Sequence, residues 1–310
     1  MISRKTVLIL GAGASQPYGF PLGRQLLNQI CLQLSPENRE NDHHKVLRDL
    51  GHTPNDIETF RDALRFTDYN SVDEFLEYDP NLMDIGKHAI ASALIPYEDE
   101  KLLFPPHTKG DHWYKLLADA LDIRSKSVYD NQVSVLTFNY DRSLEVYLFT
   151  VIHERSECSV TEAIEILQSI PIIHLYGDLG QFGCTNQDAQ KYSPDLKTAR
   201  VKAGAESMKI IHESEDQTPE FDQGVELLEQ AECIYFLGFG YHPTNVRRLR
   251  VFNSEWDEER KLRQVVKGTI LKIENQEWGT IVDKVFHGNI NGRQHKGDCS
   301  SFLRTFAQLS

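Results

Sequence analysis

The sequence is poor in cysteine and has no long apolar run. Its five cysteines lie far apart, at Cys31, Cys158, Cys184, Cys233 and Cys299. Such spacing builds neither a disulfide framework nor a zinc site made of CxxC pairs, so we expect free thiols. No apolar run approaches the ~20 residues that a membrane-spanning helix needs. The first apolar run passes directly into a glycine turn and lacks the cleavage region of a signal peptide. We therefore expect a cytoplasmic protein without a membrane partner.

Basic residues are also fewer than acidic ones. The 310 residues include 33 basic and 46 acidic side chains, which gives a net charge of −13. Because contact with nucleic-acid phosphates needs positive charge, this balance argues against direct nucleic-acid binding. His43, His44 and His112 have no metal-ligating partners at useful spacing, so we assign no metal. The hydrophobic content of 40% is ordinary for a globular protein that buries a core.

The strongest local pattern begins at residue 7. An apolar run stops at Gly11-Ala12-Gly13-Ala14-Ser15, and an amphipathic segment follows over residues 22–34. This order predicts a strand, a glycine turn and a helix, in which small residues and free N–H groups let the backbone approach a diphosphate. The usual fingerprint would place a third glycine where this chain has Gln16, so the match is incomplete. We interpret the pattern as a dinucleotide cradle; the alternative is a tight turn without a ligand.

Four further apolar runs predict strands, at residues 132–137, 170–176, 233–237 and 268–273. Each ends in polar or glycine residues before a helix, so the fold expected is a doubly wound, Rossmann-like parallel α/β sheet. Residues 1–310 are expected to form one such domain.

Helical segments fill the sequence outside the predicted strands. Residues from about 36 to 127 keep helical spacing and form a large helical insertion, which either covers the cradle as a lid, forms an oligomer surface or packs on a sheet edge. The polar stretch 186–220 predicts a partly helical excursion or a mobile segment. Residues 300–309 predict a short closing helix.

The predicted strand ends carry the residues that resemble a known family. Gly11–Ser15, followed by Gly19-Phe20-Pro21 and Arg24, resembles the first sirtuin motif. The run 137–141, TFNYD, is similar to the sirtuin TxNxD motif, and HLYGD at 174–178 lies where the histidine motif is expected. Gly238-Phe239-Gly240, with Asn245 soon after, is similar to the later glycine motif. The resemblance implies that NAD contacts Gly11, Ala12, Gly13, Ser15, Pro21, Arg24, Thr137, Gly238, Gly240 and Asn245.

The same resemblance implies catalytic roles for Asn139, Asp141, His174 and Tyr176. Asn139 has a donor and an acceptor and suits orientation of a water or a ribose hydroxyl. Asp141 would accept the carboxamide N–H of nicotinamide. The family usually has HG, so alignment on Gly177 puts Tyr176 in the catalytic position; His174 lies two residues earlier on the same face of the strand. We favour His174 as base or hydroxyl partner, with Tyr176 assisting it.

Two departures narrow the resemblance. Deacylating sirtuins carry a zinc module with two CxxC pairs, and this chain has none. Together with the helical insertion, and with SVDEFLE at 71–77 and FNYDRSLE at 138–145, this makes the chain similar to bacterial sirtuin-like immune effectors that consume NAD. The implied activity is hydrolysis of NAD, as substrate and without zinc, to nicotinamide and ADP-ribose, so that NAD depletion serves antiviral defence. Alternatives are a non-catalytic sensor of NAD or ADP-ribose and an NAD-dependent protein deacylase.

The resemblance also implies assembly. Effectors of this size form oligomers or work beside a separately encoded hexameric ATPase of the HerA type, and this chain has no Walker GxxxxGK[ST] motif of its own. We therefore expect a homo-oligomer or an ATPase partner. The basic cluster Arg247-Arg248-Arg250 is interpreted as a solvated helix face, with phosphate binding as the alternative.

Overall fold

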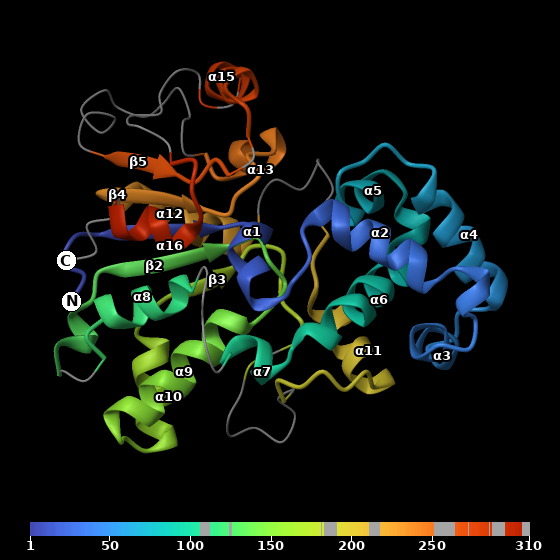
Figure 1. Ribbon diagram of the computed structural model, residues 1–310, viewed down its shortest axis with the longest axis horizontal. Coiled ribbons are helices and arrows are strands. Elements are labelled where there is room, and N and C mark those ends of the chain that lie inside the picture. Colours follow the sequence, from blue (N-terminus) through green and yellow to red (C-terminus); the bar gives the residue numbers. More distant parts are fainter. Residues whose placement is uncertain are drawn as a thin grey trace.

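Five parallel strands form one sheet, which lies to one side of the molecule, on the left in Figure 1. The computed structural model describes residues 1–105, 112–123, 126–180, 182, 191–210, 218–250, 264–271, 273–284, 286 and 295–305. The strands are β1 (Thr6–Leu10), β2 (Val133–Thr137), β3 (Ile172–His174), β4 (Cys233–Leu237) and β5 (Val265–Gly268). Their spatial order is β3-β2-β1-β4-β5, so successive strands are added on one side of β1 and then on the other.

The three central strands are buried on both faces. Every residue of β1, β2 and β4 is buried, which explains why they are continuous apolar runs. In the parallel register Leu136 and Phe236 both pair with Ile9 and so share one face of the sheet. Helix α12 (Pro219–Gln230) packs on that face, since a Cβ added at its Gly224 would lie 3.4 Å from Leu136.

The opposite face is covered as well. Tyr235 precedes Phe236 and points the other way, and its ring centroid lies 5.7 Å from that of Phe302 in helix α16 (Cys299–Thr305). Helices therefore cover both faces. This confirms the prediction of a doubly wound, Rossmann-like parallel α/β sheet.

Between β1 and β2 the described chain contains helices and turns but no strand of the sheet. The helices of this stretch are α1 (Ala12–Ser15), α2 (Gly23–Gln33), α3 (Asp42–Asp49), α4 (Pro54–Arg65), α5 (Val72–Tyr78), α6 (Met83–Leu94), α7 (Glu100–Leu103) and α8 (Trp113–Ala120). The later helices are α9 (Ser143–Ser156), α10 (Val160–Gln168), α11 (Thr198–Ser207), α13 (Pro243–Arg248) and α15 (Asn275–Lys284). None of the described helices combines the length and apolar character needed to cross a bilayer.

A helical lobe stands beyond the carboxyl ends of the strands (Figure 1). It consists of α2 to α6, with α11 packed against α6 although more than 100 residues separate them in sequence. Helix α6 lies at the centre of the lobe and contacts α2, α3, α4 and α5. The helical insertion thus places one lobe beside the edge at which open α/β sheets bind ligands.

The main error in the predicted elements concerns the last strand. The expected strand 268–273 is found at Val265–Gly268 instead. Its partner β4 ends at Leu237. The N–H of Thr269 still donates to the carbonyl of Phe236 at 2.9 Å, but Ile270 donates its N–H to the carbonyl of His295 at 2.8 Å instead. An edge strand with the sequence VVKG is only partly buried, so its apolar pattern is weak. The predicted closing helix is α16, and residues 306–310 lie outside the described residues.

Candidate functional site

Two glycine turns meet at the carboxyl edge of the sheet, where β1 and β4 end. The N–H of Gly13 donates to the carbonyl of Gly238 at 2.9 Å. A Cβ added at Gly13 would lie 2.8 Å from that oxygen, and one added at Gly238 would lie 2.1 Å from the nitrogen of Ala14. Gly238 also has φ of +56°. Only glycine fits such an approach of two backbones. A glycine of the turn after β4 thus packs against the first glycine turn, which has Gln16 where the usual fingerprint has its third glycine.

The predicted amphipathic helix is present as α2, but it does not begin at the glycine turn. The chain first forms the short helix α1 and one 3₁₀ turn over Gln16–Tyr18. Gly19, with φ of +97°, then ends that turn, and α2 starts at Gly23. This detour brings Pro21 and Gly23 back beside the glycine turn.

A cavity of about 690 Å³ opens over the contact of the two turns. It lies between the carboxyl ends of β1 and β4, where the strand order reverses, which is where open α/β sheets bind their ligands. Gly13, Gly238 and Gly240 line it, with Thr269 beyond them. Its volume is within the range of small-molecule and cofactor sites.

A second, smaller cavity of about 80 Å³ lies on the other side of the first turn. Asn139, Asp141 and Pro21 line it, and it shares Ala12 and Gly23 with the larger cavity. The glycine turn after β1 therefore separates a large cavity from a small one, and a ligand in contact with Ala12 could reach both.

Asn139 is held against the first glycine turn. Its Nδ2 group donates to the carbonyl of Gly11 at 3.0 Å and to Oγ of Ser15 at 2.9 Å, while its backbone N–H donates to Oγ1 of Thr137 at 3.1 Å. These bonds consume the amide donors. Within the described residues no partner approaches Oδ1, which leaves that acceptor for a water or hydroxyl in the small cavity. Ser15 and Thr137, both buried, thus act by positioning Asn139.

Asp141 is buried at the same strand end. One carboxylate oxygen, Oδ1, accepts hydrogen bonds from the backbone N–H of Ser143 at 3.2 Å and from its hydroxyl. Burial raises the pKa of Asp141 above its usual range, although the hydrogen bonds of Ser143 and Ser15 oppose the shift. The carboxyl group is therefore anchored by Ser143 and Ser15 and lines the small cavity.

His174 is engaged at both ring nitrogens. Its Nδ1 lies 2.9 Å from the carbonyl oxygen of Asn139, and its Nε2 lies 2.5 Å from Oε1 of Glu145. Burial would lower the pKa of His174, but the carboxylate of Glu145 outweighs it, with help from Asp178 and the Asn139 carbonyl, and raises the pKa to about 9. A charged imidazolium that donates both N–H groups cannot accept a proton. The geometry therefore makes His174 a positioning residue for Asn139 and gives no support to the predicted general base.

Tyr176 belongs to a different network. Its hydroxyl donates to Oδ1 of Asn245 at 2.7 Å and accepts from Nη1 of Arg248 at 2.7 Å. Arg248 also pairs with Glu77 at 3.4 Å. Burial, partly offset by Arg248, raises the pKa of Tyr176 to about 12. Neither Tyr176 nor Asn245 lines the two cavities, so this network joins β3, α13 and α5 rather than facing a ligand.

The environments of two arginines differ from those predicted. Arg248 was interpreted as part of a solvated helix face, yet it is 2% exposed and paired with Glu77. Arg24 was assigned to the cofactor, but it is exposed on α2, lines neither cavity and donates to the carbonyl of Tyr69 at 2.6 Å. The structure brings the glycines, Ser15, Pro21, Thr137, Asn139 and Asp141 together and leaves Arg24, Tyr176 and Asn245 outside the two cavities.

Several cavity residues gave no signal in the sequence. Tyr18 and His112 line the large cavity, with the Tyr18 hydroxyl 3.3 Å from Nδ1 of His112. Glu277, in α15, and Asp298, just before α16, also line it, although both lie far along the chain. Only Tyr18, inside the glycine-rich segment, stood near a recognised motif. The others reach the site through packing of distant helices, which no local pattern encodes.

A buried ion network supports the strand end. Arg142, 1% exposed, donates from Nε and Nη2 to the carboxylate of Glu98 at 2.9 and 2.7 Å. Arg200 donates to the same carboxylate at 2.6 Å. Because Arg142 follows Asp141, the network fixes the chain beside the small cavity to the insertion and to α11.

Among solved structures, the chain is similar to a triple mutant of a Sir2 homologue in complex with 2′-O-acetyl-ADP-ribose. The two sequences are 13% identical, the match covers 98% of this chain and 89% of that chain, and the TM-score is 0.38. No protein-family model matches the chain, and no curated protein matches it significantly.

Proposed function

We propose that this protein binds NAD across the carboxyl edge of its sheet and hydrolyses it to nicotinamide and ADP-ribose. The observation that carries the proposal is the position of Asn139, fixed to the glycine turn that separates the two cavities. The large cavity would hold the nucleotide, with the diphosphate on the glycine contact. The small cavity would hold the nicotinamide ring beside Asn139 and Asp141.

The reaction breaks the bond between C1′ of the ribose and the ring nitrogen of nicotinamide. The bonding electrons go to the positively charged ring, so nicotinamide leaves as a neutral molecule and no general acid is required. The ribose passes through an oxocarbenium-like state, and water adds at C1′ with loss of one proton to solvent. Oδ1 of Asn139 would accept a hydrogen bond from that water or from a ribose hydroxyl. The carboxyl group of Asp141 would accept the carboxamide N–H.

Incubation of the purified protein with NAD tests the proposal. Nicotinamide and ADP-ribose are quantified at low protein concentration and again with the protein concentrated enough to assemble. We expect equal amounts of both products, and loss of both in Asn139→Ala. Absence of products in every assembly state, with NAD binding retained, would reject hydrolysis.

One observation favours a second candidate, a sensor that binds NAD or ADP-ribose without turnover. Both nitrogens of His174 are occupied, so this histidine of the predicted catalytic motif is not available as a base. Tight NAD binding without product would support this candidate. Acyl transfer from an acylated peptide to ADP-ribose would instead identify a deacylase.

The proposal extends to biological context through the motif resemblance alone. We propose that the enzyme acts in bacterial antiviral defence by depleting NAD, and that it is activated by oligomerisation or by a hexameric ATPase partner of the HerA type. Measurement of cellular NAD during infection, with wild-type protein and with Asn139→Ala, tests this part. An unchanged NAD level in infected wild-type cells would contradict it.

A further inference from the structure

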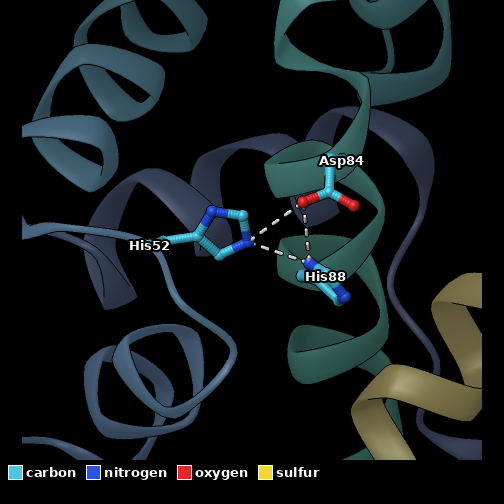
Figure 2. Close-up of side chains that lie close together, drawn as sticks. All are labelled: His52, Asp84 and His88. Atoms are coloured by element: carbon cyan, nitrogen blue, oxygen red, sulfur yellow. Dashed lines mark hydrogen bonds and ion pairs between the residues drawn. The ribbon is translucent and has the colours of Figure 1, made fainter.

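Three potential metal ligands converge in the helical lobe, away from both cavities. Their nearest ligand atoms, Nε2 of His52, Oδ2 of Asp84 and Nδ1 of His88, all lie within 4.8 Å of one another. Figure 2 shows the ring of His52 facing the two α6 residues across a narrow gap. The sequence predicted no metal, on the spacing of His43, His44 and His112, and singled out none of these three residues; His52 stands 32 residues before Asp84 in the chain.

The fold fixes each of the three side chains. Helix α3 ends in a Schellman motif, in which the N–H of His52 donates to the carbonyl of Leu47 at 3.1 Å and that of Gly51 to Arg48 at 2.9 Å. Gly51 has φ of +99°, which turns the chain so that His52 faces α6. Asp84 and His88 are four residues apart on α6 and therefore share one face of the helix.

The distances match the edges of a metal coordination shell. Nε2 of His52 lies 2.9 Å from Nδ1 of His88, and Oδ2 of Asp84 lies 3.7 Å from each of them. Ligands about 2.0–2.1 Å from a tetrahedral ion stand about 3.3–3.4 Å apart. The observed ligand–ligand distances, 2.9 and 3.7 Å, lie on either side of this value. We propose that His52, Asp84 and His88 bind one zinc ion, independently of the NAD site.

The donor set favours zinc over the alkaline-earth ions. Two imidazoles suit zinc and its neighbours, whereas calcium and magnesium take oxygen ligands. The histidine side chains are 12% and 10% exposed, while Asp84 is 82% exposed. The protein thus supplies three ligands, two of them from histidines that are largely shielded from solvent, and leaves a fourth coordination position open to water. Bound zinc would tie the end of α3 to α6, the central helix of the lobe.

A metal-free alternative explains part of the arrangement. One imidazole N–H could donate to the other ring across 2.9 Å, and Asp84, in the first turn of α6, is favoured there by the helix dipole. In that case zinc would find no site. The test must therefore measure binding of zinc and its dependence on each ligand.

Zinc affinity is measured on the full chain, stripped of metal with a chelator, by competition with a zinc-binding dye. We expect one ion per chain and a gain in melting temperature when zinc is added. His52→Ala and His88→Ala should each weaken binding at least about 100-fold, since even outer-shell partners of metal ligands contribute 10–100-fold. Asp84→Asn should weaken it less, and His153→Ala, outside the cluster, serves as the matched control.

Cobalt substitution, measured together with circular dichroism, distinguishes the loss of a metal ligand from a failure to fold. Wild-type protein and the His153→Ala control should give the visible absorption of a nitrogen-ligated, four-coordinate cobalt ion, whereas His52→Ala should lose it with unchanged circular dichroism. Zinc binding that is absent, or that persists unchanged in both histidine variants, would overturn the proposal and leave the hydrogen-bonded histidine pair.

Discussion

The Nε2 atom of His174 lies 2.5 Å from Oε1 of Glu145, and this ion pair makes a histidine of the predicted catalytic motif into a fixed cation. The side chains of the two residues are 10% and 14% exposed, so solvent screens the pair little. The carbonyl of Asn139 accepts the other N–H of the ring. The pair therefore fixes the backbone of the residue on which the proposed chemistry depends.

The ion pair predicts a loss of stability at alkaline pH. The pKa of His174 is raised from 6.5 to about 9 in the folded chain, so its contribution is complete below about pH 6.5 and is lost as the pH rises through 9. At about 1.4 kcal/mol per pKa unit, the contribution is at most about 3.5 kcal/mol. Urea unfolding at pH 6.5 and pH 10 should show wild type losing more stability than Glu145→Gln. An equal loss of stability between the two pH values in wild type and in Glu145→Gln would contradict the pairing.

Asn139→Ala should lower the rate of nicotinamide release by about 100-fold or more, the usual cost of removing one preorganised polar contact at a reacting centre. The variant keeps the backbone bond to His174, so the fold should survive. Asn38→Ala, which removes an exposed amide bonded to the carbonyl of Leu32, is the matched control. A folded Asn139→Ala protein with normal turnover would remove Asn139 from the site.

Substitution of Gly238 should lower the stability of the fold, whereas substitution of Gly240 should not. Gly238→Ala meets the backbone of Ala14 at 2.1 Å and is strained at φ of +56°, so it should cost about 2 kcal/mol or more of folding free energy. A Cβ at Gly240 meets nothing within 4 Å, so Gly240→Leu should fold normally and intrude on the large cavity. Thermal unfolding and NAD titration separate the effects. Equal stability of the two variants would contradict the backbone contact.

Glu98→Ala should destabilise the fold by about 3–5 kcal/mol, because it leaves Arg142 buried without its carboxylate. Arg142 also donates to the carbonyl of Gly180 at 2.9 Å, but a neutral carbonyl does not balance its charge. Glu58→Ala removes a carboxylate from an exposed ion pair with Arg39 and should cost less than about 1 kcal/mol. Denaturant unfolding of both variants gives the comparison; similar losses would show that the buried network is not structural.

NAD should be preferred over NADP. A 2′-phosphate usually needs a nearby arginine, and no arginine or lysine is among the described residues that line the large cavity. Glu277 and Asp298 are its acidic side chains and would repel the extra phosphate. Competition between the two nucleotides in a binding assay measures the preference. Equal affinity would place a positive side chain near the ribose that the described lining does not contain.

The sequence by itself determined the fold class, three of the five strands nearly to the residue, and the glycine turn with Asn139 beside it. Buried parallel strands are continuous apolar runs and glycine turns tolerate few substitutes, so both leave a local signature. The sequence did not determine that Gly238 packs against Gly13, that Glu145 fixes His174, or that His52 meets α6. These relationships join residues far apart in the chain, and only the packing of helices and strands brings their side chains within bonding distance.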